Sequence, residues 1–304
     1  MAALAAPTLA RRRLKTALHG RLWPFLVPSG LVIGCVLLYP LGYALYLSLF
    51  RYELGTNTQE FIFLGNYSAL LQEARFWESL ARTTGIVLSA VGLEFSLGLA
   101  IAYGLYRLTY GVRVFNMLLF LPHIVTPVVA ALFLRWIFMG RWGLLSAGLL
   151  GLGFFPPDFL GNPFWARITV VLADAWQFTP FMILVLYAGL NTVDQSQIEA
   201  AQIDGAGIWT LLFHIMLPAI RPLIVFVLAI RIMDAFRFFD QIYVLTSGGP
   251  GTATETITMY TYALAFRLLE IGKASALGVL TLIVSASLIA LMIAAIYWRE
   301  RERI

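Results

Sequence analysis

The chain has 304 residues, of which 60% are hydrophobic and only 12% carry a charged side chain. Soluble globular domains contain about 25% charged residues, so this composition excludes a soluble protein, whose water-facing surface needs many more charges. Many cations behind the net charge of +5 lie beside apolar segments, which argues against a nucleic-acid partner. The single cysteine, Cys35, excludes an intrachain disulfide, and the dispersed histidines predict no metal site.

Apolar stretches long enough to cross a bilayer recur along the chain, since a spanning helix needs roughly 20 such residues. They cover residues 25–50, 84–106, 114–138, 168–190, 220–245 and 274–298. The predicted fold class is therefore an all-α integral membrane protein with six transmembrane helices. Its six-span domain covers 25–298, between tails at 1–24 and 299–304. The first stretch is too long for the apolar core of a signal peptide, so we expect it to remain as a helix.

The distribution of Lys and Arg predicts the orientation of the spans. An even number of spans places both termini on one side, and the loops predicted on that side are richer in Lys and Arg. Most of this bias comes from a basic cluster ahead of the first span, which consists of Arg11, Arg12, Arg13 and Lys15. The positive-inside rule then predicts that both termini are cytoplasmic.

The predicted outer connections are longer than simple turns. Residues 51–83 contain Tyr52, Tyr67 and Trp77, aromatic side chains typical of the membrane interface. The apolar stretch 144–155 is too short to span and predicts a helix in or near the outer interface. Within the spans, Pro122, Pro127 and Pro180 predict bends, because proline removes a helix hydrogen bond.

The longest predicted cytoplasmic connection, residues 191–219, has the pattern of two short helices. Asp194 or Ser196 is expected to cap the first helix, and the alanines after Glu199 favour it. Gly205 and Gly207 permit a sharp turn, and a second apolar helix over 208–217 is expected to end against Pro218. Two helices joined in this way across the membrane surface form a docking shape.

The sequence of this loop resembles a known family. Glu199-Ala200-Ala201, three residues, Gly205, nine residues and then Ile215-Met216-Leu217-Pro218 is similar to the EAA loop of ABC importer permeases. Six spans with this loop between the fourth and fifth match the core of the carbohydrate-importer permeases of the maltose-transporter type. The resemblance covers nearly the whole chain and includes the Leu245–Pro250 stretch after the fifth span.

The resemblance implies that the chain is one subunit of a larger transport complex. The loop would be the coupling helix that fits a groove of a cytoplasmic ATPase, with coupling residues Glu199, Ala200, Ala201, Asp204 and Gly205. The implied partners are a second permease subunit, two ATP-binding subunits and an extracytoplasmic solute-binding protein, besides membrane lipid. The sequence has no Walker phosphate loop, so we expect no cofactor and no enzymatic activity in this chain, with ATP and Mg bound by the ATPase subunits. The implied location is the cytoplasmic membrane of a bacterium or an archaeon.

Charged residues inside the predicted spans mark the candidate solute pathway, because an ionised group near the bilayer centre needs a partner or water. Arg231 and Asp234 share a face of span five, and span four has a polar and aromatic face of its own. Such faces suit a sugar, whose ring stacks on aromatic groups while its hydroxyls form hydrogen bonds. By the resemblance, the solute would meet Gln177, Phe178, Phe181, Arg231, Asp234 and Phe238.

Other interpretations of these charges stay open at this point. Arg231, Asp234, Arg237 and Asp240 would equally serve to lock helices together or to face a partner. A phosphorylated polyol, as in a glycerol-phosphate importer, would suit the two arginines. An ion-coupled secondary transporter would use Arg231 and Asp234 as a relay, but such proteins usually contain inverted repeats, and this sequence shows none clearly. In spans two and three, Glu94, His123 and Arg135 are interpreted as packing, interface or gate residues.

Overall fold

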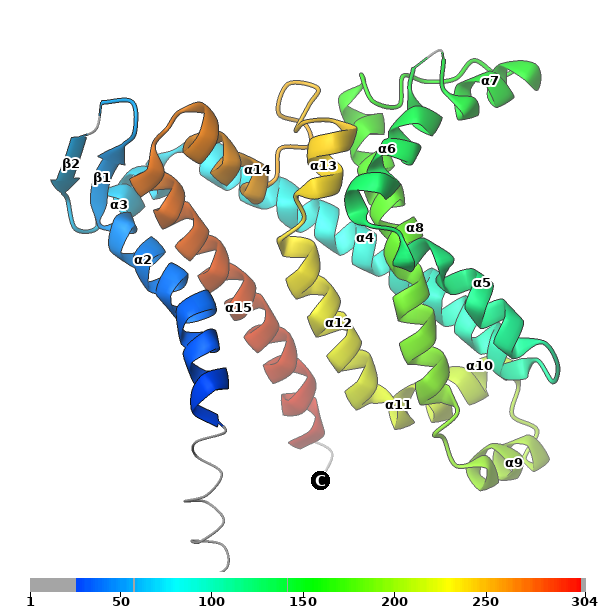
Figure 1. The fold of residues 1–304 in the computed structure, drawn as a ribbon. Helices are drawn as coiled ribbons and strands as arrows, with labels where there is room; N and C mark the ends of the chain where they lie inside the picture. The colour runs from blue at the N-terminus through cyan, green and yellow to red at the C-terminus, as the bar shows by residue number, and fades with distance from the viewer. Residues whose placement is uncertain (1–25, 57, 141, 302–304) are drawn as a thin grey trace, which may run out of the picture.

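The computed structural model describes residues 26–56, 58–140 and 142–301. The predicted tail at 1–24 lies outside these residues together with its basic cluster. The regular elements of the described chain are helices and one antiparallel hairpin, in which β1 (Phe50–Glu53) pairs with β2 (Thr58–Phe61). The sequence did not predict this hairpin. The all-α prediction therefore holds for the membrane part of the molecule (Figure 1).

Within the described residues, four helices are long and apolar enough to cross a membrane. They are Leu26–Ser48, α4 (Ala74–Arg107), α8 (Pro163–Leu190) and residues Ile271–Ala294 of α15 (Ile271–Arg301). The first of them contains η1 (Gly34–Leu38) and α2 (Tyr39–Ser48). Two bent pairs bring the number of spans to six if each pair is one span: α5 (Val112–Ile124) with α6 (Pro127–Phe138), and Ile208–Ala219 with α12 (Arg221–Phe236). The helix α15 reaches Arg301, so the tail predicted from residue 299 begins within a helix.

Short elements lie at the two ends of the spans (Figure 1). One end carries the hairpin, α3 (Gly65–Gln72), α7 (Leu144–Gly151), α13 (Asp240–Leu245), α14 (Ile257–Tyr262) and η3 (Ala263–Arg267). The opposite end carries α9 (Gln195–Ile203), α10 (Ile208–Thr210), η2 (Leu211–Met216) and α11 (Leu217–Ala219). The first helix begins and α15 ends at this second end, as an even number of spans requires.

The predicted third span, 114–138, is broken where the sequence predicted a bend. The axes of α5 and α6 differ by 91°. Pro127 is at the start of α6, and the residue before a proline is pushed out of the helical region. Thr126 accordingly has ψ 143°, which is extended backbone. The bend predicted at Pro127 is therefore present, and it is sharp enough to divide the predicted span into two helices.

The predicted fifth span, 220–245, is also interrupted. The helix α12 ends at Phe236, and Phe239 has the non-helical angles φ −126° and ψ −55° before α13 begins. The break frees the carbonyl of Phe238, which accepts a 2.8 Å hydrogen bond from the Thr258 hydroxyl. A contact from another part of the chain therefore compensates for the lost helix bond, and periodicity along 220–245 could not reveal it.

The second helix of the 191–219 loop continues past Pro218 to Ala219 and is not ended by it, contrary to the prediction. The preceding turn is a π-helix, in which the N–H of Leu217 bonds to the carbonyl of Leu212. This wider turn gives the proline ring the room that an α-helix denies it. The chain bends instead after Ala219, at Ile220, where Ile208–Ala219 meets α12 at 75°.

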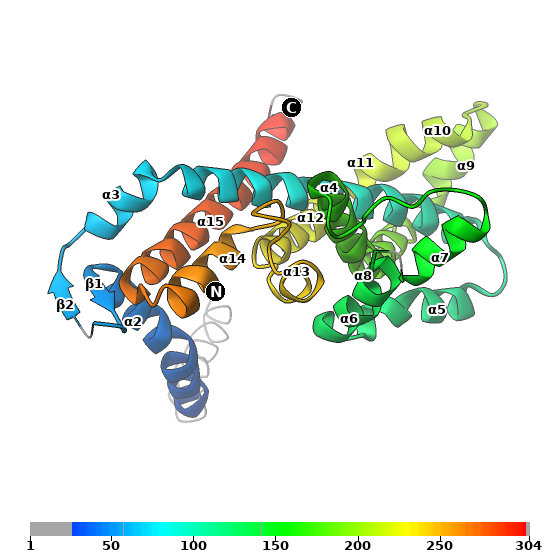
Figure 2. The same ribbon diagram turned by 90° about the horizontal axis from the view of Figure 1, so that it is seen from above.

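The helices form two groups joined by α4 (Figures 1 and 2). In both views the first helix, the hairpin and α15 lie at one side, and α5, α6 and α7 lie at the other. The main apolar core is shared by α4, α8, α9, η2 and α12, with Met182 and Leu186 completely buried. A second core joins α3 and α4 to α14 and α15.

Gly272 allows the start of α15 to approach strand β1. A Cβ atom at residue 272 would overlap the carbonyl oxygen of Phe50 and lie 2.9 Å from the backbone nitrogen of Tyr52. We therefore expect Gly272→Ala to destabilise the protein by about 1–3 kcal/mol, because backbone atoms have to separate. Gly278→Ala in the same helix is the matched control, since its Cβ would meet nothing within 4 Å. Thermal unfolding of the purified protein should show a lower Tm for Gly272→Ala only.

Candidate functional site

A single arginine ties three spanning helices together in the middle of the molecule. Arg231 of α12 donates to both carboxylate oxygens of Glu94 on α4, at 2.7 and 2.8 Å. It also donates to Asp174 on α8 at 2.9 Å and to Asp234, one turn away, at 2.9 Å. Its guanidinium lies 4.0 Å from the centre of the Phe178 ring. We call Glu94, Asp174, Arg231 and Asp234 the charge cluster.

The charge cluster is buried at one end and open at the other. Arg231, Glu94 and Asp174 are at most 2% exposed, whereas 55% of the Asp234 side chain is exposed. Buried ions need good geometry and hydrogen bonds to offset the loss of hydration, and the bidentate Arg231–Glu94 pair supplies both. The cluster therefore has a structural part, which holds α4, α8 and α12 together, and an accessible part at Asp234.

The accessible part opens into a cavity of about 190 Å³ between α8, α12 and α13, at the break before α6. Polar and aromatic groups dominate its walls. The lining residues are Pro127, Asp174, Phe178, Asp234, Ala235, Arg237, Phe238, Phe239, Asp240 and Gln241. Arg231 is not among them and lies behind the wall.

Hydrogen bonds next to the cavity stabilise the break between α5 and α6. The Gln177 amide donates to the carbonyl of Val125 at 2.7 Å, and Val125 lies in the break between the two helices. Gln177 also accepts a hydrogen bond from the amide of Gln241. His123 stacks on Phe181, with ring centres 5.8 Å apart, and its Nδ1 lies 3.3 Å from the Gln177 carbonyl oxygen.

The predicted pathway residues thus fall into two sets. Phe178, Asp234 and Phe238 line the cavity, and Arg231, Gln177 and Phe181 support its walls. The sequence did not identify Glu94 as the main partner of Arg231. Its one available signal was a carboxylate inside an apolar span, which requires a cation somewhere in the bundle.

The 191–219 loop has the predicted two-helix form. Asp194 caps α9, accepting hydrogen bonds from the backbone N–H of Ser196 at 3.0 Å and from its hydroxyl at 2.9 Å. These bonds lower the pKa of Asp194. Ile198 is buried in the main core and anchors α9, and Gly205 adopts φ +81° at the turn after it.

The outward surface of this loop carries large exposed apolar side chains. Ile203 is 86% exposed and Trp209 is 71% exposed, and the Trp209 ring stacks on Phe213. Of the predicted coupling residues, Ala201 is half-buried and the rest are exposed: Glu199, Ala200, Asp204 and Gly205. Exposed apolar groups of this size, concentrated at one turn, mark a contact surface.

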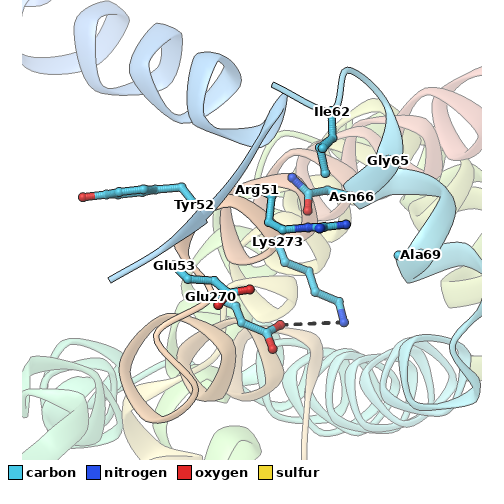
Figure 3. Close-up of a pocket in the computed structure, with 9 residues that line it drawn as sticks. All are labelled: Arg51, Tyr52, Glu53, Ile62, Gly65, Asn66, Ala69, Glu270 and Lys273. Carbon is cyan, nitrogen blue, oxygen red and sulfur yellow. Dashed lines mark ion pairs between the residues drawn. The ribbon is translucent and has the colours of Figure 1, made fainter. Parts of the chain in front are cut away.

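A second polar cavity, of about 250 Å³, lies at the other end of the molecule beside the hairpin (Figure 3). The Asn66 amide in its wall donates to the carbonyls of Ser48 and Phe50, both at 2.8 Å. Lys273 points toward Glu270, 3.8 Å away, and also bonds to Glu73. These side chains already have partners within the chain, so we interpret this cavity as part of the joint between the hairpin, α3 and α15.

The joint makes stability depend on pH through Glu73. Partial burial opposes ionisation of this carboxyl, but hydrogen bonds from Lys273 and Tyr260 and the charges of Lys273 and Arg75 together lower its pKa. A lowered pKa contributes stability above the unfolded-state pKa and loses it as pH falls through the folded-state value. We expect the Tm of the natural protein to fall more steeply below the ordinary glutamate pKa than that of Glu73→Gln. Equal slopes in acid would contradict this role.

Comparison with known proteins places these features in context. The family model of the binding-protein-dependent transport system inner membrane component matches residues 94–301. The trehalose transport system permease protein of Mycobacterium tuberculosis is 38% identical over 277 residues, covering 90% of this chain and 85% of that protein. The trehalose/maltose transport system permease protein of Thermococcus litoralis is 34% identical over 262 residues, covering 86% of this chain and 88% of that protein.

A solved structure has the same fold. It is a chain of the bacterial alginate ABC transporter in complex with an alginate pentasaccharide-bound periplasmic protein. The match has a TM-score of 0.78 at 21% identity and covers 91% of this chain and 94% of that chain. The likeness therefore extends over nearly the whole chain.

Proposed function

The chain belongs to the family of binding-protein-dependent transport system inner membrane components, and from this membership we propose that it carries a sugar, polyol or related small carbohydrate into the cytoplasm. It does so as one permease subunit of an ATP-driven ABC importer. The observation that carries the solute class is the cavity, whose aromatic rings and hydrogen-bonding groups lie among spanning helices. Sugars fit such walls because C–H faces stack on rings while hydroxyls bond laterally.

The exposed apolar turn between α9 and α10 supports the proposed coupling to an ATPase. Most of the Ile203 and Trp209 side-chain surface is exposed, and a cytoplasmic subunit would cover it. We assign the coupling contact to Glu199, Ala200, Ala201, Asp204 and Gly205. This assignment places α9 and both termini in the cytoplasm.

The proposed assembly contains a second permease subunit, two ATP-binding subunits and an extracytoplasmic solute-binding protein. ATP and Mg would bind to the ATPase subunits, and this chain supplies the pathway. The family description and the periplasmic protein bound to the alginate transporter support this arrangement. The domain organisation that we propose is a six-span permease over 25–298 with the coupling loop at 191–219.

Movement would pass from the loop to the cavity through the main core. Ile198 on α9 belongs to the same apolar core as residues of η2 and α12, so this core would transmit a displacement of α9 to the helix that carries Asp234. The breaks at Thr126 and Ile220 are the points where rigid helices change direction. Alternating access would be a rigid-body movement between two packed arrangements, biased by ATPase closure.

The ion-relay alternative loses its main residue in the structure. Arg231 is held by Glu94 and Asp174 as well as Asp234, so the Arg231–Asp234 pair is not a free relay. The glycerol-phosphate alternative is weakened for the same reason. The guanidinium of Arg231 is already bound by carboxylates and is not available to a phosphate.

Uptake by the reconstituted transporter tests the proposal. Proteoliposomes would contain this chain, its partner subunits and the solute-binding protein, with radiolabelled trehalose, maltose or lactose outside. We expect one or more of these sugars to accumulate only with internal ATP and Mg. Uptake that persists without ATP or without the ATPase subunits would refute the importer function.

A further inference from the structure

The walls of the cavity between α8, α12 and α13 have an excess of negative charge. Three carboxylates line it, Asp174, Asp234 and Asp240, against the single guanidinium of Arg237. Behind the wall, Arg231 is matched by Glu94, whose two oxygens it binds. Counted as ionised groups, the nearby side chains therefore carry two negative charges in excess, and Asp234 and Asp240 are the exposed carboxylates among them.

Two buried oxygens in the same walls lack a hydrogen-bond donor. Oδ1 of Asp174 and Oε1 of Gln241 have no partner within the described residues, and both residues line the cavity. Asp174 is 2% exposed and Gln241 is completely buried. An unsatisfied buried acceptor costs free energy until a donor reaches it. These oxygens therefore favour a ligand that donates hydrogen bonds.

Resting on the proposed function, we propose that this cavity selects solutes by charge. It accepts sugars that are neutral or carry an ammonium group, and it rejects those with a phosphate, sulfonate or carboxylate group. Hydroxyl and ammonium groups donate to Asp174, Asp234 and Gln241, while the rings of Phe178 and Phe238 cover the apolar ring faces. An anionic group is repelled by the carboxylates and finds hydrogen-bond acceptors where it needs donors. The single positive charge of Arg237 does not compensate for this repulsion.

Thiol reagents of opposite charge measure this property without any knowledge of the solute. The assembled transporter in nanodiscs would carry Phe238→Cys in a Cys35→Ser chain. The probes are the trimethylammonium-ethyl and sulfonato-ethyl methanethiosulfonates, each normalised to its rate with free 2-mercaptoethanol. Two excess charges at this range favour the cationic reagent by about tenfold or more. A normalised ratio of one or below would overturn the proposal.

Neutralising variants provide controls of opposite sign. Asp234→Asn with Asp240→Asn should bring the ratio close to one, and Arg237→Gln should raise it. A labelling ratio that is the same in all of these variants would show that these residues do not set the electrostatic potential of the cavity. Neutral methyl methanethiosulfonate measures access, and resistance of the introduced thiol to all three reagents during ATP turnover would refute the cavity as a solute pathway.

The uptake assay separates this proposal from the proposed function. If no sugar enters the proteoliposomes, the proposed importer function is refuted, and the thiol-labelling ratio still tests the charge of the cavity independently. If glucose 6-phosphate enters as fast as a neutral sugar, the charge selection fails and the importer function stands. We expect uptake of trehalose or maltose at least tenfold faster than that of glucose 6-phosphate.

Discussion

Replacing Arg231 with methionine is expected to destabilise the folded permease by about 3–5 kcal/mol. The change removes four hydrogen bonds and leaves Glu94 and Asp174 buried with no counter-charge. Methionine fills most of the volume of the arginine stem, so the loss is electrostatic more than steric. Detergent-solubilised Arg231→Met should show a much lower Tm by fluorescence-detected size-exclusion chromatography, and much of it should aggregate.

A variant without the buried charges is the control for this prediction. Adding Glu94→Gln and Asp174→Asn to Arg231→Met removes the unpaired carboxylates, and we expect most of the lost Tm to return. Asp234→Asn alone should cost less than about 1 kcal/mol, because 55% of that side chain is exposed to screening solvent. An unchanged Tm in Arg231→Met would mean that the charge cluster does not hold the helices together.

The charge cluster shows which parts of a site sequence patterns can predict. Arg231 and Asp234 are three residues apart, and helical spacing alone predicted their contact, which the structure has at 2.9 Å. Glu94 is 137 positions away from Arg231, and its contact depends on how α4 crosses α12. Nothing in the local sequence encodes that crossing. The presence of a partner was predictable from membrane energetics, and its identity was not.

The helix breaks follow the same division between local and distant causes. The break at Thr126 was predicted in position, because Pro127 acts on its own neighbours. The break after Phe236 depends on a hydrogen bond from Thr258, twenty residues from Phe238, and was missed. In the loop, Asp194 was one of two predicted caps and is the one that bonds. Local rules therefore succeed where the partner is a sequence neighbour.

The turn of the 191–219 loop offers the second large effect, because its two glycines differ in conformation. Gly205 has φ +81°, a left-handed conformation that costs an L-residue roughly 1–2 kcal/mol. Gly207 has φ −71° and ψ 169°, which any residue adopts. A Cβ atom would meet nothing within 4 Å at either position. Alanine at 205 therefore acts through the backbone alone, and alanine at 207 is the matched control.

Gly205→Ala is expected to uncouple ATP hydrolysis from transport. The strain favours a rearranged turn and changes the angle between α9 and α10, where the proposed ATPase contact at Glu199 and Ala200 lies. We expect ATP-dependent uptake in proteoliposomes to fall by about tenfold. A free-energy cost of roughly 1.4 kcal/mol for adopting the coupling geometry corresponds to that factor. The amount of assembled complex and its basal ATP hydrolysis should be retained, because Gly205 is exposed and an added Cβ meets no other atom within 4 Å. Full uptake in Gly205→Ala, or an equal loss in Gly207→Ala, would mean that the left-handed turn does not set the coupling geometry.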